Sequence, residues 1–155
     1  FNVHAAGGVR MMEAALEGLE RECRAGQARP QVVAVTQLTS TDQTVLNEEI
    51  GIPGTVEQAV LQYARLAQRA GLNGVVASPR EVSAIKQALG EGFVTVTPGI
   101  RPRGAEPGDQ SRIMTPKEAV EQGSDYLVIG RPITAAQDPR QALEQIVEEM
   151  KSIAE

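Results

Sequence analysis

The stretch that decides the fold contains two apolar runs, V-T-V-T-P-G-I-R at 94–101 and D-Y-L-V-I-G-R-P at 125–132. Each run has the β-branched, apolar character of a buried strand and ends at a glycine, with an arginine just beyond it. Guanidinium groups and exposed backbone N–H groups are the usual ligands of a phosphate. Either arginine alone would be an ordinary surface charge. Their matching positions favour a shared anion site that contains Arg101 and Arg131.

The same order of strand and then helix repeats along the rest of the chain. Strand-like runs begin near positions 1, 31, 73, 93 and 125, and helical spacing of apolar residues follows them. We expect helices over 9–24, closed by Gly26, over 56–70, closed by Gly71, and over 139–153. Four helix starts share one design, with Gln or Glu three residues after an N-cap side chain. These N-caps are Thr55, Ser78, Thr115 and Asp138.

Alternating strands and helices with short connections predict a parallel sheet. An open doubly wound sheet would normally carry a G-x-G-x-x-G turn after its first strand, which is absent here. A (β/α)8 barrel needs about 250 residues, and the 155 residues of this chain are close to five-eighths of that. We therefore predict an α/β fold, a TIM barrel that is incomplete at its amino-terminal side. Residues 1–155 would form a single domain of about five βα units, the carboxyl-terminal part of the barrel.

Composition excludes several classes of function. The formal net charge of −5 argues against nucleic acid or an anionic membrane surface as the main partner. No apolar run approaches the roughly 18 residues of a membrane span, so we expect a soluble protein. Cys23 is the single cysteine and has no partner for a disulfide, which favours a cytoplasmic location. It has no metal-ligand spacing around it, and we expect neither a metal nor a cofactor. The chain opens directly in strand-like sequence without Met, which suggests a piece of a longer protein.

Binding residues of a parallel barrel collect where its strands end at their carboxyl side. Polar and glycine-rich residues gather at those points here, notably at 36–40, 97–101 and 130–131. The connection from Pro102 to Met114 is long, polar and rich in Gly and Pro, so we predict a lid with Gln110 as its contact to the ligand. The lysines fall within predicted helices, and no catalytic residue is assigned in this chain.

Six motifs together resemble one family, the bacterial orotidine 5′-phosphate decarboxylases. They match in order along the whole chain: V-H-A-A-G-G at 3–8, A-V-T-Q-L-T-S at 34–40, G-V-V-A-S at 74–78, V-T-P-G-I-R-P at 96–102, G-D-Q-S-R at 108–112 and V-I-G-R-P-I-T at 128–134. The resemblance implies a homodimeric TIM barrel that converts orotidine 5′-monophosphate to uridine 5′-monophosphate in de novo pyrimidine biosynthesis, without a cofactor. It also implies that Arg101, Gln110, Gly130 and Arg131 hold the phosphate, and that Thr39 and Ser40 stand near the base.

The chain departs from the family in one respect. The family's reactive centre is an alternating array of lysine and aspartate that includes D-L-K-x-H-D-I-P, on the strand before the one that opens this chain. An aspartate of that loop reaches the neighbouring subunit. None of this array is present in the 155 residues. The resemblance therefore implies that this chain supplies the phosphate- and base-binding part of the enzyme, and that the missing amino-terminal strands supply the catalytic residues.

Two alternative functions remain open from the sequence. One is a sugar-phosphate decarboxylase of the same fold; Thr39, Ser40 and Gln110 favour the nucleotide over this substrate class. The other is a non-catalytic half-barrel that binds a phosphate or a partner chain. The absent lysine array favours this second alternative, while the two unpaired sheet edges of a five-stranded half-barrel speak against it.

Overall fold

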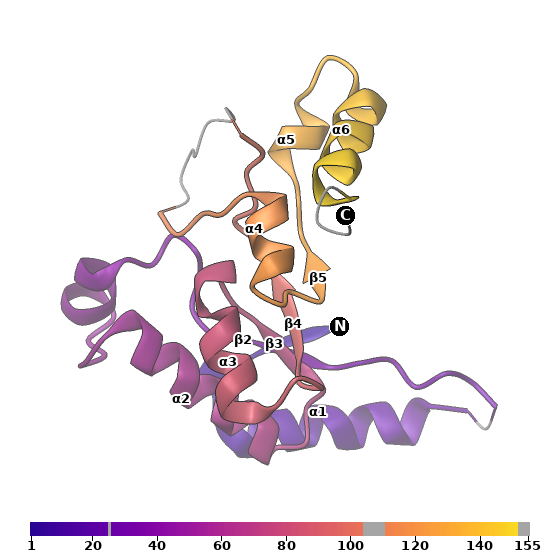
Figure 1. Ribbon diagram of the computed structural model, residues 1–155. Helices are drawn as coiled ribbons and strands as arrows, with labels where there is room; N and C mark the ends of the chain where they lie inside the picture. The colour runs from indigo at the N-terminus through magenta and orange to yellow at the C-terminus, as the bar shows by residue number, and fades with distance from the viewer. Residues whose placement is uncertain (25, 104–110, 152–155) are drawn as a thin grey trace.

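Five strands form one parallel sheet in the computed structural model, which describes residues 1–24, 26–103 and 111–151 (Figure 1). The strands are β1 (Asn2–His4), β2 (Val33–Val35), β3 (Gly74–Val76), β4 (Val94–Thr97) and β5 (Tyr126–Leu127). Their order in the sheet is β1-β2-β3-β4-β5, so every strand lies beside its neighbour in sequence. In a doubly wound sheet the order of the strands would reverse at a switch point. The uninterrupted order confirms the predicted succession of barrel strands.

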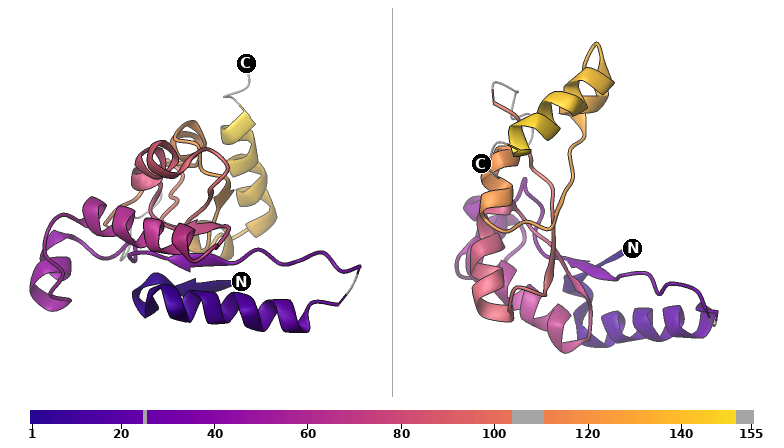
Figure 2. Two further views of the ribbon diagram at one scale, coloured as in Figure 1. Left: turned by 90° about the horizontal axis from the view of Figure 1, so that it is seen from below. Right: turned by 45° about the vertical axis from the view of Figure 1, so that its right-hand side comes forward.

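Helices follow the strands and lie outside them (Figure 2). They are α1 (Gly8–Glu22), α2 (Val56–Arg69), α3 (Val82–Leu89), α4 (Pro116–Glu121), α5 (Arg131–Thr134) and α6 (Pro139–Lys151), together with the short turns η1 (Ala5–Gly7), η2 (Val45–Glu49) and η3 (Pro79–Glu81). Helix α2 packs between α1 and α3, and α4 packs against α6. This succession of helices along a parallel sheet is the arrangement of a barrel wall. No helix in the described ranges is long and apolar enough to cross a membrane.

The predicted helix starts are present in the structure. Thr55 and Thr115 each form a complete capping box with the residue three positions on, and Asp138 Oδ1 accepts a hydrogen bond of 3.0 Å from Gln141 N. Ser78 differs, because its Oγ accepts from Arg80 N and begins the turn η3 ahead of α3. Glu81 is three positions after Ser78, and its carboxylate forms an ion pair with Arg112.

Three boundaries differ from the prediction. Helix α1 ends at Glu22, because Cys23 is already extended with φ −74° and ψ 112°. Residues 45–49, where no helix is predicted, form the π-helical turn η2, which buries Leu46. Residues 131–134 form the short helix α5, where Pro132 stands in the first turn and suits the fixed φ of that position. In each case a local turn was decided by packing or by proline and not by apolar periodicity.

The core lies between the sheet and the helices α1, α2 and α3. Apolar residues from the strands and from the inner helix faces are buried together; the largest cluster includes Met12, Val32, Ala34, Leu46, Val60, Ala64, Val75, Ile85 and Phe93. Many of the helix positions carry alanine, which lets the helices approach the sheet closely. The parallel register is regular, with Asn2 opposite Val33, Val33 opposite Gly74 and Gly74 opposite Val94. The carboxyl ends of the strands therefore finish at one edge of the sheet.

A polar network ties α3 to the amino-terminal ends of β4 and β5. Lys86 is 5% exposed, and its Nζ donates to Glu91 O at 2.8 Å, Phe93 O at 3.1 Å and Asp125 Oδ2 at 2.7 Å. The same Oδ2 accepts from Thr95 N at 2.7 Å and Thr95 Oγ1 at 2.9 Å. Burial alone would raise the pKa of Asp125, but the hydrogen bonds from Lys86 and Thr95 outweigh it and hold that pKa below its usual range.

We expect Asp125→Asn to destabilise the fold by about 2 kcal/mol, because it leaves the buried Lys86 ammonium without its counter-charge. Since the pKa of Asp125 is lowered in the folded state, its contribution is complete above the unfolded pKa and is lost as the pH falls through the folded pKa. The difference in unfolding free energy between the two proteins should therefore shrink on acidification. Urea unfolding at pH 7 and at pH values below about 4 measures it.

The matched control is Glu144→Gln, which removes the carboxylate of the exposed Arg140–Glu144 pair on α6. An exposed pair contributes at most about 1 kcal/mol, so this variant should unfold almost as the parent does. Equal effects of the two substitutions would contradict the assigned role of Asp125.

Candidate functional site

The predicted site residues follow the carboxyl ends of three strands. Thr39 and Ser40 come after β2, Arg101 after β4, and Gly130 and Arg131 after β5. Because the five strands are parallel and in register, these positions all belong to one end of the sheet. Gln110 lies outside the described residues.

The two predicted phosphate-binding arginines have different environments. Arg101 is 8% exposed, and its Nη1 donates to Ile100 O at 2.8 Å. Its backbone is also held, since Arg101 N donates to Met114 O at 2.9 Å. Arg131 is exposed at the start of α5. Of the two guanidinium groups, that of Arg131 is thus the one at the surface.

The backbone beside Arg131 limits which amides can contact an anion. Ile133 N and Thr134 N both donate to Gly130 O, at 2.8 and 3.0 Å, and Pro132 has no N–H. A side chain built on Gly130 would meet nothing within 4 Å. Packing within the described chain therefore leaves open space beside Gly130, at the point where the sequence predicts a phosphate.

The long connection after β4 is closed at its base by a parallel bridge between Ile100 and Met114. Met114 N donates to Gly99 O at 3.2 Å, on the other side of the bridge from the Arg101 hydrogen bond. The residues on either side of the predicted lid therefore leave and rejoin the sheet at the same place. Ser111 to Met114 form the arm that returns to the sheet after the predicted lid, and this arm lies against the turn after β2.

Ser111 and Arg112 hold that turn through its backbone. Thr39 O accepts from Ser111 N at 3.3 Å, Ser111 Oγ at 3.1 Å and Arg112 N at 3.3 Å. Arg112 Nη2 donates to Leu38 O at 2.7 Å. Thr39 is buried and Ser40 is exposed. The turn predicted to face the base is thus bonded directly to the arm that follows Gln110.

Arg112 is itself anchored by a buried ion pair with Glu81. Its Nη1 bonds Glu81 Oε1, and the two side chains are 9% and 6% exposed. Ser78 Oγ donates to Arg112 O at 3.0 Å, so the start of α3 holds both the side chain and the backbone of Arg112. Burial raises the pKa of the Glu81 carboxyl above its usual value, against the attraction of Arg112 and a hydrogen bond from the Ser78 backbone.

Sequence reasoning missed this pair. In the sequence Arg112 stands in the motif G-D-Q-S-R, and Glu81 is the third residue of a helix start. Nothing in the local pattern links two residues separated by 31 positions. The one available signal was that both residues follow a strand, because the carboxyl ends of parallel strands lie at the same edge of the sheet.

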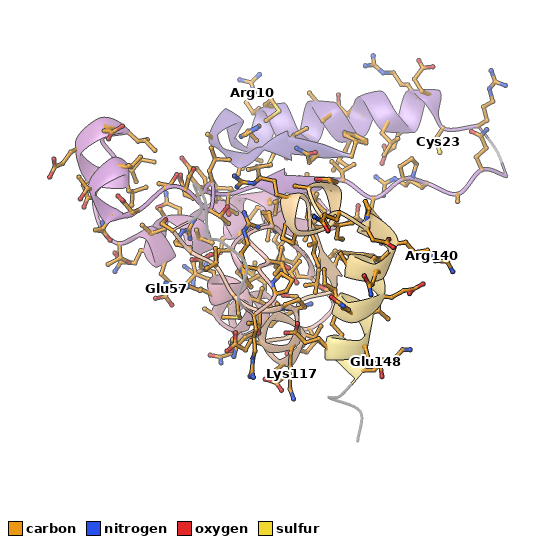
Figure 3. The ribbon with its side chains drawn as sticks, turned by 90° about the horizontal axis from the view of Figure 1, so that it is seen from above. Arg10, Cys23, Glu57, Lys117, Arg140 and Glu148 are labelled. Atoms are coloured by element: carbon orange, nitrogen blue, oxygen red, sulfur yellow. The ribbon has the colours of Figure 1, made fainter. Side chains whose placement is uncertain are left out.

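None of the lysines stands at the site. The sequence contains Lys86, Lys117 and Lys151, which lie in α3, α4 and α6 as predicted. All three bonds that the Lys86 ammonium can donate are already used at the opposite end of the sheet. Figure 3 shows Lys117 at the periphery of the molecule. Among the described residues there is also no group of three His, Cys, Asp or Glu side chains that could hold a metal ion.

Comparison with known proteins identifies the family. The model of the orotidine 5′-phosphate decarboxylase / HUMPS family matches residues 1–146. The chain belongs to this family. It is 54% identical over 153 residues to an orotidine 5′-phosphate decarboxylase of Heliobacterium modesticaldum, covering 97% of this chain and 62% of the relative. It is 53% identical over 148 residues to one of Lactococcus lactis subsp. cremoris, covering 96% of this chain and 62% of the relative.

A solved structure of the family has the same fold. The crystal structure of orotidine 5′-phosphate decarboxylase from Lactobacillus acidophilus aligns with a TM-score of 0.80 at 41% identity, covering 96% of this chain and 62% of that one. The chain thus spans about three fifths of the length of the family members that it matches. This coverage agrees with the prediction of an incomplete barrel, and the family match confirms the resemblance.

The backbone of Gly99 lies close to Thr39 and Arg112, and a substitution at Gly99 tests this contact. Its φ is +81°, and a side chain there would lie 3.0 Å from Arg112 O and 3.2 Å from Thr39 Cγ2. We expect Gly99→Ala to incur the left-handed backbone cost of about 1–2 kcal/mol and roughly 1 kcal/mol more from displacing its neighbours. Chemical denaturation measures the loss.

Gly51 is the matched control, with φ +77° and nothing within 4 Å of an added side chain. Gly51→Ala should lose only the backbone part. If the two variants were equally destabilised, the contact among Gly99, Thr39 and Arg112 would have no energetic weight.

Proposed function

We propose that this chain is the phosphate- and base-binding part of an orotidine 5′-phosphate decarboxylase. The observation that carries the proposal is the identity of 54% and 53%, over almost the whole chain, with relatives that bear this name. In the proposed reaction the bond between the pyrimidine ring and its carboxylate breaks, carbon dioxide leaves, and the electron pair stays on the ring carbon until a proton is added. No cofactor takes part.

The proposed binding residues divide into two groups. Arg131, Gly130, Arg101 and Gln110 bind the phosphate, and Thr39 with Ser40 lies near the base. The exposed fork of Arg131 and the open space beside Gly130 support the first group. The strand-end position of Thr39 and Ser40 supports the second. Within the first group Arg101 would contribute less to phosphate binding than Arg131, because its side chain is buried against Ile100 O.

The catalytic charge has to come from outside these 155 residues. Decarboxylation is accelerated by a cation placed where negative charge develops, and the three lysines of this chain stand in helices away from the strand ends. We propose that amino-terminal strands of the same barrel supply the lysine and aspartate array. They would pair with the open edges of β1 and β5. Exposed apolar residues at these edges, Phe1, Tyr126 and Val128, support this.

The groove beside β5 fits the same proposal. It is lined by apolar residues of β5, α5 and α6, among them Tyr126, Ile133, Leu143 and Met150. A further barrel unit would cover it. Homodimer formation and a cytoplasmic location are parts of the proposal that rest on the family resemblance. A sugar-phosphate decarboxylase of the same fold remains the second candidate, because the matching family is broader than the orotidine 5′-phosphate decarboxylases alone.

One prediction of this proposal concerns the chain by itself. The purified 155-residue chain should show no decarboxylation of orotidine 5′-monophosphate, and should bind uridine 5′-monophosphate weakly or not at all. Addition of the amino-terminal strands should restore activity if the sheet edges pair again. Release of carbon dioxide or loss of the substrate absorbance measures turnover. Turnover by the chain alone would mean that the catalytic charge lies within it.

Another prediction of the proposal compares the arginines in the completed barrel, meaning this chain together with the amino-terminal strands. Arg131→Ala should lower kcat/KM by roughly 10- to 150-fold, since a charge-assisted hydrogen bond contributes about 1.5–3 kcal/mol. Arg101→Ala should lower it less and should reduce stability more, because Arg101 is buried. Steady-state kinetics and urea unfolding on both variants separate the two effects.

The nucleoside orotidine is the control substrate for this comparison, because it lacks the phosphate. Neither variant should lose much activity toward it. A larger kinetic penalty for Arg101→Ala, or an Arg131→Ala penalty that persists on the nucleoside, would contradict the assignment.

A further inference from the structure

We propose that Glu81 and Arg112 form a positioning pair that holds the turn Leu38–Ser40 in the shape needed to face the base. The inference rests on the proposed function, in which Thr39 and Ser40 stand beside the pyrimidine. Neither Glu81 nor Arg112 contacts the ligand in this scheme. They act through the backbone of the turn.

Three consecutive carbonyl groups, those of Gln37, Leu38 and Thr39, accept hydrogen bonds from the same arm. Arg112 Nη2 donates to Leu38 O at 2.7 Å and also reaches Gln37 O at 3.5 Å. Thr39 O accepts from Ser111 and from Arg112 N. In an extended strand successive residues alternate in direction, so this convergence requires the chain to wind around Ser111 and Arg112. The path of the turn is therefore set by the arm and not by the sheet.

The guanidinium group is divided between the carboxylate and these carbonyls. Nη1 serves Glu81 and Nη2 serves the turn, while Arg112 Nε and Glu81 Oε2 are buried without a hydrogen-bond partner among the described residues. A side-on bidentate pair would have used both carboxylate oxygens and been the stronger ion pair. In the observed geometry the guanidinium group makes one bond to the carboxylate and keeps its contact to Leu38 O.

Stability alone is a poor explanation of such a pair. Burying two charges incurs a desolvation cost that the attraction between them often fails to exceed, and apolar replacements are frequently no less stable. A buried fork that fixes backbone carbonyls gives something an apolar contact cannot, which is a defined orientation. Glu81 is well placed for this, because it stands at the junction of η3 and α3, where Ser78 Oγ also holds Arg112 O at 3.0 Å.

The pair therefore joins three strand ends. Glu81 belongs to the segment after β3, Arg112 to the arm that returns after β4, and Leu38 and Thr39 to the turn after β2. The arm that carries Arg112 is also the one that follows Gln110. A change at Glu81 is thus expected to reach the turn that the proposal places beside the base, by way of Arg112.

The test uses Glu81→Gln in the completed barrel and reads local order without any ligand. Amide hydrogen exchange should accelerate on the order of 10-fold at Ser111 and Arg112, whose N–H groups donate to Thr39 O. The amide of Ala77, which donates to Val96 O within the sheet, should be unchanged. Arg112→Lys keeps the charge but loses the fork, and should reproduce the result if Glu81→Gln does not fold. Glu144→Gln is the matched control on the exposed pair of Arg140, which Figure 3 shows at the periphery.

The second measurement is binding of uridine 5′-monophosphate and of uridine. Glu81→Gln should weaken both by a similar factor, on the order of 10-fold, because it disturbs the base end. Arg131→Ala should weaken only the monophosphate. The inference is overturned if exchange at Ser111 and Arg112 is unchanged, if Ala77 accelerates equally, or if Glu81→Gln weakens the monophosphate alone. If the parent barrel binds neither ligand, the proposed function fails while the exchange result still decides whether the pair holds the turn.

Discussion

The carboxyl end of this sheet depends on the buried contact of Arg112 with Glu81 and Leu38 O. Parallel strands leave their last carbonyl and amide groups without partners, and each following loop must find its own hydrogen bonds. Here the guanidinium group of Arg112 donates to a backbone carbonyl of the turn after β2. The backbone of Arg112 also forms hydrogen bonds with the segments after β2 and β3. The loops at this end are thereby joined to one another, and the polar residues among them are held in fixed positions.

The other end of the sheet is organised by a second buried cation. Lys86 bonds two carbonyls and Asp125 at the amino ends of β4 and β5, and it is saturated by them. The contrast between the two ends has a chemical consequence. Lys86 keeps no hydrogen for a substrate, whereas Arg131 stands exposed beside Gly130. The buried lysine and the arginine that we propose for phosphate binding thus stand at opposite ends of the strands, as is usual for stabilising and binding residues in parallel barrels.

The open edges of the half-barrel explain why binding and chemistry would be divided along the sequence. A barrel removes its edges only when the last strand meets the first. Five consecutive strands can carry the binding turns after β2, β4 and β5, but they leave β1 and β5 unpaired on one side. Any catalytic group on the remaining strands would face the same central space. The described residues thus bring the predicted binding turns to one end of the sheet, and further strands would complete the proposed site.

The sequence by itself determined the elements and their order. Apolar periodicity located the five strands and the main helices, and the N-caps Thr55, Thr115 and Asp138 placed helix starts correctly, because these signals act within a few residues. The positions of the lysines also followed from local pattern. The tertiary structure alone decided the pairs Arg112–Glu81 and Lys86–Asp125, whose members are 31 and 39 residues apart. It also decided that Arg101 is buried while Arg131 is exposed, since both follow a glycine at a strand end and differ only in what packs over them. Such choices depend on strand register and on which loops meet, and neither is encoded in the spacing of residues along one segment.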